Sequence, residues 1–207
     1  MPTKSGVLGI LAAALGRKRD DSLEDLAKLE FGIRVDCQGT KLKDFQITQM
    51  GGKLNSNLSE RTYLSDAIFL VGLGYEDMGF LKELEEALRH PIFAVFLGRR
   101  SCPPTQPLVL GIRNRDLYQA LLEEEWLVPE WRRNTLFRFS DKEKLRIVMD
   151  ADCGKGVKKD VPVSFSPFKR EYRYRYQREM PGKLVEKGQS FSRVPTEHDP
   201  MIELGEN

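Results

Sequence analysis

The sequence predicts a single α+β domain followed by a mobile tail. Its length of 207 residues suits one domain with extensions and allows a sizeable core. Several short runs, among them 31–35 and 67–73, alternate with period two or are rich in β-branched and aromatic residues, as strands are. Residues 76–89 instead carry apolar side chains at helical spacing. We place the domain at 1–176 and the tail at 177–207, where no periodicity continues.

The first half of the chain is predicted to begin with a helix over residues 6–15. Thr3 or Ser5 would provide its N-cap, and the free amides at that end would suit a phosphate. Ser22 is the expected cap of a short acidic helix that ends at Leu29. The elements that follow are strands at 31–35, 41–48 and 67–73 and the amphipathic helix at 76–89.

The second half is predicted to contain more strands than helices. The strands are 91–97, 108–113, 136–139, 145–149 and 169–176, with the third and fourth forming a hairpin, and the helix is 116–126. The strand at 91–97 is the most apolar of these, so we expect it to be buried.

A polar insertion separates two of the predicted strands in the first half. Between residues 48 and 60 the chain is dominated by Gln, Gly, Asn and Ser, and the only large apolar residues are Met50, Leu54 and Leu58. A segment this polar buries little surface, so it should project from the domain or remain a disordered surface loop in the free protein.

Charge is distributed unevenly along the chain. The formal net charge is only +2, yet residues 131–178 hold 14 Lys/Arg against 6 Asp/Glu. Such segregation is typical of a protein that binds a polyanion, although an unevenly solvated surface would give the same pattern.

Several classes of function lack support in the sequence. The three cysteines are scattered without a C-x-x-C pair, which suits a reducing, cytoplasmic protein without disulfides or zinc. The apolar run at 10–15 is too short to span a bilayer. With two histidines and no ligand-like spacing, neither a metal centre nor a histidine acid/base pair is indicated. We therefore expect no cofactor.

The strongest candidate site is the turn that follows the apolar run at 91–97. Gly98 is followed by Arg99, Arg100 and Ser101, and three prolines then stiffen the chain at 103, 104 and 107. A guanidinium pair on a rigid turn is a good platform for a phosphate backbone. Taken alone, the same residues also fit a strand end with solvated arginines.

A second pattern lies near the end of the predicted domain. Residues 169–176 alternate with period two, so in a strand three tyrosines would share one face and Arg173 and Arg175 the other. Tyrosine rings can stack on bases and arginines can hold phosphates. The alternative is a strand that packs its tyrosines on the core and extends its arginines to solvent.

Four segments, in order, carry a resemblance to a known family. They are Pro-Thr-Lys-Ser-Gly-Val-Leu-Gly at 2–9, Tyr-Leu-Ser-Asp-Ala at 63–67, Leu-Gly-Arg-Arg-Ser-Cys-Pro at 97–103 and Asp-Val-Pro-Val-Ser-Phe at 160–165. With these segments the chain resembles the CasD subunits of type I-E CRISPR Cascade, members of the repeat-associated mysterious protein (RAMP) superfamily. The resemblance spans roughly the first 176 residues.

The resemblance implies a ferredoxin-like, RRM-like domain with a projecting thumb hairpin at 48–60. Members of the family carry about one further strand before the Pro-Thr-Lys-Ser-Gly segment (of ordinary strand length). We therefore expect the first strand of a β-α-β-β-α-β unit to be missing from this chain and one sheet strand to lack a neighbour.

The resemblance also implies a function. It points to a non-catalytic subunit that binds CRISPR RNA (crRNA), caps the 5′ handle within the Cascade complex and so contributes to antiviral defence. The implied partners are the crRNA, the large subunit and the first backbone subunit, with target DNA reached only through the complex. Sister RAMP families cleave RNA without metal, so a metal-independent endoribonuclease that processes repeat RNA is the alternative. The expected RNA-binding residues are Lys4, Ser5, Gly6, Phe45, Lys53, Arg61, Arg99, Arg100, Ser101, Arg170 and Arg173.

Overall fold

The protein combines an antiparallel sheet with helices on both of its faces and a separate two-stranded arm. The computed structural model describes residues 1–49, 56–105, 107–136, 142–154 and 156–186. The helices are α1 (Lys4–Ala14), α2 (Glu24–Ala27), α3 (Met78–Arg89), α4 (Leu117–Glu123) and α5 (Glu130–Leu136). The strands are β1 (Glu30–Cys37), β2 (Thr40–Gln49), β3 (Ser56–Ser65), β4 (Ile68–Gly74), β5 (Lys142–Ala151), β6 (Gly156–Ser164) and β7 (Glu171–Glu186). The predicted mixture of helices and antiparallel strands is confirmed.

The main sheet has the strand order β4-β1-β5-β7-β6. Every neighbouring pair is antiparallel, and the longest strand, β7, pairs with both β5 and β6. Within the described residues β4 has a strand neighbour on one side only, so its other edge is open.

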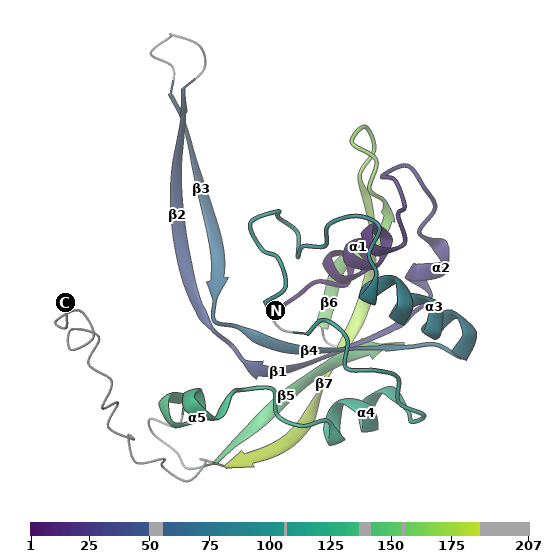
Figure 1. The fold of residues 1–207 in the computed structure, drawn as a ribbon, viewed down its shortest axis with the longest axis vertical. Coiled ribbons are helices and arrows are strands. Elements are labelled where there is room, and N and C mark those ends of the chain that lie inside the picture. Colours follow the sequence, from purple (N-terminus) through teal and green to yellow (C-terminus); the bar gives the residue numbers. More distant parts are fainter. Residues whose placement is uncertain (50–55, 106, 137–141, 155, 187–207) are drawn as a thin grey trace, which may run out of the picture.

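Helices cover the two faces of this sheet unequally. On one face, α1 packs against β6 and α3, and its leucines form the largest buried cluster together with those of α2 and Leu84 of α3. On the other face α4 lies over β1 and β4, where Gly32 and Gly72 leave room for Leu117 and Leu121. Figure 1 shows α1, α2 and α3 grouped on one side of the sheet and α4 on the opposite side.

Helix α1 runs from Lys4 to Ala14, so it begins two residues and ends one residue earlier than the predicted 6–15, and Thr3 is the one of the two predicted caps that forms. The Thr3 side chain accepts a hydrogen bond from the amide of Gly6, which makes Thr3 the N-cap. At the other end Gly16 has a φ of 74°, a left-handed conformation that glycine adopts without strain and that commonly ends a helix. The helix is apolar on most of its surface because both the sheet and α3 pack against it.

The predicted projecting insertion is part of a longer arm. Strands β2 and β3 pair from Thr40 with Ser65 to Gln49 with Ser56, so the hairpin begins well before residue 48 and ends beyond residue 60. It extends away from the main sheet as a two-stranded ribbon (Figure 1). Residues 50–55, which include Met50 and Leu54, two of the large apolar residues of the insertion, lie outside the described residues.

The prediction of strands at 91–97 and 108–113 is wrong. Neither segment is a strand, and Ile92, Phe93, Leu108 and Leu110 are exposed rather than buried. An apolar run forms a strand only where a neighbouring strand offers hydrogen-bonding partners, and the described residues offer none to these segments.

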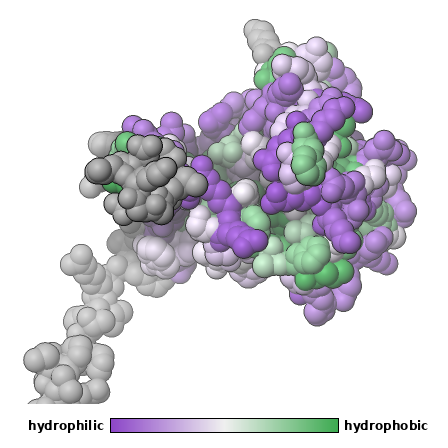
Figure 2. Space-filling model, turned by 90° about the horizontal axis from the view of Figure 1, so that it is seen from above, coloured by the Kyte–Doolittle hydropathy of each residue, from purple (hydrophilic) through white to green (hydrophobic). Residues whose placement is uncertain are grey.

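Seen from above, the body of the protein is mostly hydrophilic, with separate hydrophobic patches between the polar side chains (Figure 2).

Two further boundaries differ from the prediction. Strand β7 continues to Glu186, so residues 177–186 belong to the sheet and not to a tail. Their partner is β5, whose register with β7 reaches Lys142 opposite Glu186. Leu136 ends α5 instead of beginning a strand, and residues 137–141 and 187–207 lie outside the described residues.

No helix in the described part of the chain combines the length and apolar character that a membrane crossing requires.

Candidate nucleic-acid interface

The arginine turn, residues 97–102, is a tight loop closed by its own backbone. The amide of Leu97 donates to the carbonyl of Cys102 at 2.9 Å, and the amide of Cys102 donates to the carbonyl of Arg99 at 2.9 Å. Gly98 enters the loop with a φ of 76°, which only glycine adopts readily. The turn therefore holds Arg99, Arg100 and Ser101 at the surface, where all three are exposed.

The turn lies against the base of the arm. The hydroxyl of Ser101 donates to that of Tyr63 on β3 at 3.4 Å, and the guanidinium of Arg99 lies 5.1 Å from the centroid of the Tyr63 ring. Arg61, two residues earlier on the same face of β3, lines an open pocket together with Arg99, Arg100 and Ser101. The fold thus brings together four of the predicted RNA-binding residues.

The charge of this pocket is not neutralised within the protein. In the part of the chain that the structure describes, none of the guanidinium groups of Arg61, Arg99 and Arg100 pairs with a carboxylate. Three uncompensated guanidinium groups around one pocket favour an anionic ligand, and their planar donors match phosphate oxygens.

Tyr63 is the member of this group that the prediction of site residues missed. Hydrogen bonds from Ser101, Arg99 and Arg61, in that order of importance, lower the pKa of Tyr63 because they stabilise the phenolate. The only signal in the sequence was its place at the start of the Tyr-Leu-Ser-Asp-Ala segment. Nothing local to β3 predicts that its hydroxyl meets a turn almost forty residues away.

We expect the titration of Tyr63 to report on the arginine turn. In wild-type protein the pKa of Tyr63 should lie below the ordinary range, and Arg99→Ala should move that pKa upward because one cation and one donor are lost. NMR of protein with 13C-labelled tyrosine, assigned with Tyr63→Phe, measures the shift. An unchanged pKa in Arg99→Ala would show that the guanidinium does not act on the phenol in solution.

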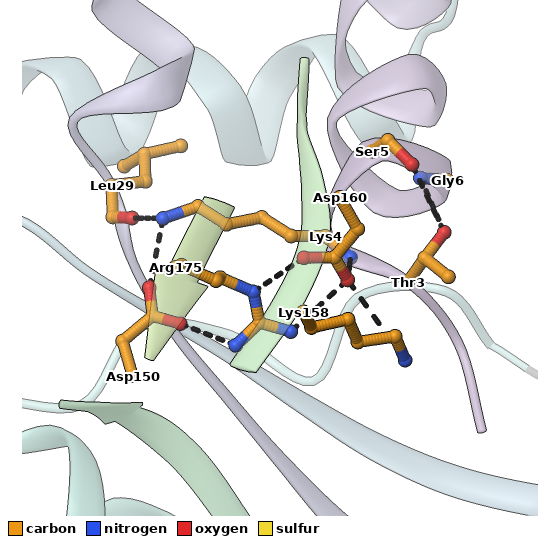
Figure 3. A network of polar contacts seen from close by, with 9 residues as sticks. All are labelled: Thr3, Lys4, Ser5, Gly6, Leu29, Asp150, Lys158, Asp160 and Arg175. Atoms are coloured by element: carbon orange, nitrogen blue, oxygen red, sulfur yellow. Dashed lines mark hydrogen bonds and ion pairs between the residues drawn. The ribbon is translucent and has the colours of Figure 1, made fainter. Parts of the chain in front are cut away.

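Lys4 lies in the interior and not at the surface predicted for it. Its ammonium donates to the carbonyl of Leu29 at 2.7 Å and to Asp150 at 2.8 Å. Arg175 bridges Asp150 and Asp160, donating to each at 2.6 Å, and the Asp160 carboxylate accepts the backbone amide of Lys4 at 3.1 Å. Figure 3 shows these two cations and two carboxylates as one buried network beneath the start of α1. Lys4 therefore cannot contact a phosphate in this structure, because its charge is already paired.

The start of α1 nevertheless adjoins the arginine turn. An added Cβ on Gly6 would lie 3.2 Å from the Leu97 side chain, so this glycine permits the close approach. The amide of Gly6 donates to the Thr3 hydroxyl, that of Val7 donates to the Thr3 carbonyl, and that of Lys4 is held by a carboxylate. Most amides of the first turn are thus engaged within the protein, which leaves less capacity for a phosphate than the sequence suggested.

The other predicted RNA-binding residues that the structure describes lie on other parts of the surface. Phe45 is 60% exposed on the arm, on the face opposite to Arg61 because its cross-strand partner is Glu60. Arg170 and Arg173 are exposed near the turn between β6 and β7 and do not line the pocket. Lys53 lies outside the described residues. Among those that are described, no group of three or more His, Cys, Asp or Glu is arranged to hold a metal ion.

The chain is similar to CRISPR-associated proteins over most of its length. The family described as CRISPR-associated protein (Cas_Cas5) matches residues 1–178. The CRISPR system Cascade subunit CasD of Escherichia coli (strain K12) is 38% identical over 146 residues, which are 60% of this chain and 65% of that protein. The match thus spans slightly less than two thirds of the relative's length.

Two solved structures share the fold. One, described as the crystal structure of a Cas protein, is 35% identical with a TM-score of 0.67, and the match covers 90% of this chain and 82% of the other. The second, a chain of a CRISPR RNA-guided surveillance complex, is 28% identical with a TM-score of 0.71 over 88% of this chain and 79% of the other.

Proposed function

Because the chain belongs to the CRISPR-associated protein (Cas_Cas5) family, we propose that it is a crRNA-binding subunit of a type I-E Cascade complex. In this role it holds the 5′ handle of the crRNA without cleaving it. The observation that carries the proposal is the pocket of Arg61, Arg99 and Arg100 at the base of the arm, where three guanidinium groups have no carboxylate partner among the described residues. Such a pocket favours the phosphates of an RNA backbone.

The arm provides the second proposed contact with the RNA. Its face that carries Arg61 and Tyr63 adjoins the arginine turn, while its other face carries Phe45, Ile47 and Leu58, all at least 60% exposed. A two-stranded ribbon with an exposed apolar face is marginally stable in water without a partner. In this proposal Phe45 contacts an RNA base. The arm then separates the handle from the rest of the crRNA by inserting between them.

Ser5 and Gly6 have a supporting role in this proposal. They lie where α1 meets the arginine turn, and the buried network of Lys4, Asp160 and Arg175 fixes that end of the helix. Lys4 is thus a positioning residue rather than a phosphate ligand. Replacing Lys4 would therefore weaken RNA binding indirectly, by displacing the start of α1.

The neighbours in the complex would be its large subunit and its first backbone subunit, with target DNA reached through the complex. Ile47 and Leu58, the residues of the apolar face of the arm other than Phe45, form a suitable surface for such a protein contact, because they are exposed in the isolated chain.

The ferredoxin-like arrangement is the finer form of the fold that we propose. The order α1, β1, β4, α3 and the antiparallel pairing of β1 with β4 agree with the α-β-β-α portion of that unit. The open edge of β4 is where a further strand of the unit would pair.

The proposed function is tested by the RNA that accompanies the protein. Expressed together with a CRISPR repeat array and the other subunits of its complex, the tagged protein should co-purify with short RNAs that share one 5′ end. Sequencing of the bound RNA measures this. RNA with scattered 5′ ends, in the same amount as with an unrelated tagged protein, would contradict handle binding.

A metal-independent endoribonuclease is the second candidate, and one observation favours it. The lowered pKa of Tyr63, surrounded by arginines, is the kind of perturbation that a general base shows. If the subunit is non-catalytic, purified protein incubated with repeat RNA in EDTA should leave the RNA intact. Cleavage at one position that Tyr63→Phe abolishes would identify an enzyme instead.

A further inference from the structure

The exposed aromatic surface of β7 is the inverse of the packing that amphipathic strands usually show. Arg175 is buried on the face that α1 covers, where it lies 5.1 Å from the ring of Phe31 and bridges two carboxylates. Tyr174 and Tyr176, which alternate with it, are 69% and 47% exposed on the opposite face. At these three positions the strand therefore buries its arginine and presents two aromatic side chains to solvent.

The two tyrosines lie where none of the described helices covers the sheet. Helix α4 occupies the same face over β1 and β4, but its contacts with β7 are few, and its Tyr118 hydroxyl reaches β7 only at the carbonyl of Pro181. Across the ladder Tyr176 pairs with Val157, which is 56% exposed, and Tyr174 pairs with Lys159. These four side chains, Val157, Lys159, Tyr174 and Tyr176, are named here the tyrosine platform.

Positive charge surrounds this platform. The ammonium of Lys159 lies 5.4 Å from the centroid of the Tyr174 ring and has no carboxylate partner within the described residues. Residues 156–178 hold seven Lys/Arg against two Asp/Glu, and Arg175 and Asp160 pair with each other in the network under α1, so six Lys/Arg and one carboxylate, that of Glu171, remain. A protein partner would need matching acidic groups around an aromatic centre, whereas a nucleic-acid strand provides a base and a phosphate in every unit.

We propose that the tyrosine platform binds unpaired bases of single-stranded RNA. Tyr174 and Tyr176 are two residues apart on one strand, so their attachment points lie about 6.6–6.8 Å apart along the sheet and offer two positions for stacking. Lys159 is close enough to the Tyr174 ring to meet the phosphate of a base stacked there.

The inference rests on the proposed function, that the protein binds crRNA, and adds to it a second contact region outside the pocket of Arg61, Arg99 and Arg100. Stacking on aromatic side chains tolerates any base because every base has a π face. The platform would therefore hold RNA beyond the handle with little sequence preference.

The test compares the affinity of variants for a fluorescein-labelled 15-nucleotide oligouridine. Tyr174→Ala with Tyr176→Ala should weaken binding at least fivefold for each base that loses its stacking partner. Tyr174→Phe with Tyr176→Phe should stay within twofold of wild type, because phenylalanine keeps the ring. Trp131→Ala is the matched control, since this side chain is 77% exposed on α5 and is not part of the platform. Circular dichroism verifies that each variant is folded.

The outcomes separate this inference from the proposed function. If Arg99→Ala with Arg100→Ala weakens binding while the alanine pair at 174 and 176 binds as wild type does, the platform is wrong and the function stands. If wild-type protein binds neither oligouridine nor handle RNA, both are wrong. If the alanine pair binds RNA normally but no longer assembles with the other subunits, the platform is a protein contact and the inference is overturned.

Discussion

Replacing Arg99 and Arg100 together by alanine is expected to weaken binding of handle RNA by about two orders of magnitude. Each arginine–phosphate contact is worth about 1.5–3 kcal/mol when both groups are charged, so two contacts contribute about 3 kcal/mol at the lower limit. Both guanidinium groups are exposed and lack a carboxylate partner among the described residues, so their loss should cost the free protein little stability.

The salt dependence of binding separates a phosphate clamp from a general loss of affinity. For single-stranded RNA each lost phosphate contact lowers the slope of log K against log salt by about 0.7, so the double variant should lose about 1.4. Arg99→Lys with Arg100→Lys should keep most of the slope but bind more weakly, because lysine retains the charge without the planar fork. Fluorescence anisotropy at several salt concentrations measures both quantities.

A matched control removes the same charge elsewhere. Arg89 and Arg146 are also exposed, but each forms an ion pair, with Glu85 and Glu179 respectively. Arg89→Ala with Arg146→Ala should therefore leave both the affinity and the salt slope close to those of wild type. If this control lowered the slope as much as the loss of Arg99 and Arg100, the effect would come from net charge and not from the turn.

Replacing Arg34 by methionine is expected to cost about 3–5 kcal/mol of the free energy of unfolding. Arg34 is fully buried, and its guanidinium donates to both oxygens of Asp36, which is equally buried. The same guanidinium donates to the carbonyls of Leu121, Glu124 and Glu125 at the end of α4. Removing one partner of such a pair leaves a buried charge without compensation.

Urea denaturation followed by circular dichroism measures this cost. The transition midpoint should fall while the slope with urea stays the same, because the folded state remains equally compact. Adding Asp36→Leu to Arg34→Met should recover part of the loss, since the uncompensated carboxylate is then absent, although the amide of Leu127 also loses its acceptor. A double variant less stable than Arg34→Met would show that Asp36 acts mainly through its other contacts and not through the ion pair.

The sequence predicted those parts of the fold that depend on local signals. The cap at Thr3, the glycine at position 16 and the helical spacing of residues 76–89 each act within a few residues, and α1 and α3 follow from them. The run at 91–97 also has a strong local preference, yet its state depends on a strand neighbour that no local pattern provides. Strand β7 begins at Glu171, two residues after the predicted start, and continues ten residues beyond the predicted end because its pairing with β5, and not its composition, extends it to Glu186.

The residues of the candidate site could likewise be predicted only where they depend on local signals. The exposed arginine turn was recognisable from Gly98 and the prolines that follow it, and the structure does present Arg99 and Arg100 at the surface. Lys4 is predicted to bind RNA because a lysine beside the free amides of a helix start suits a phosphate and because the family resemblance implies RNA at this place. The carboxylates that accept hydrogen bonds from Lys4, those of Asp150 and Asp160, come from strands far along the chain. Ser101 and Arg99, which contact Tyr63, are likewise distant from it in sequence, so only the folded structure reveals these contacts.

The most direct measurement of the central claim is an experimental structure of the protein, within its complex, bound to crRNA. We predict that phosphates of the 5′ handle lie within hydrogen-bonding distance of Arg99 and Arg100, with Tyr63 and Arg61 on the other side of the strand and the RNA intact. A structure in which this pocket faces solvent or protein, while the handle is bound elsewhere, would contradict the assignment.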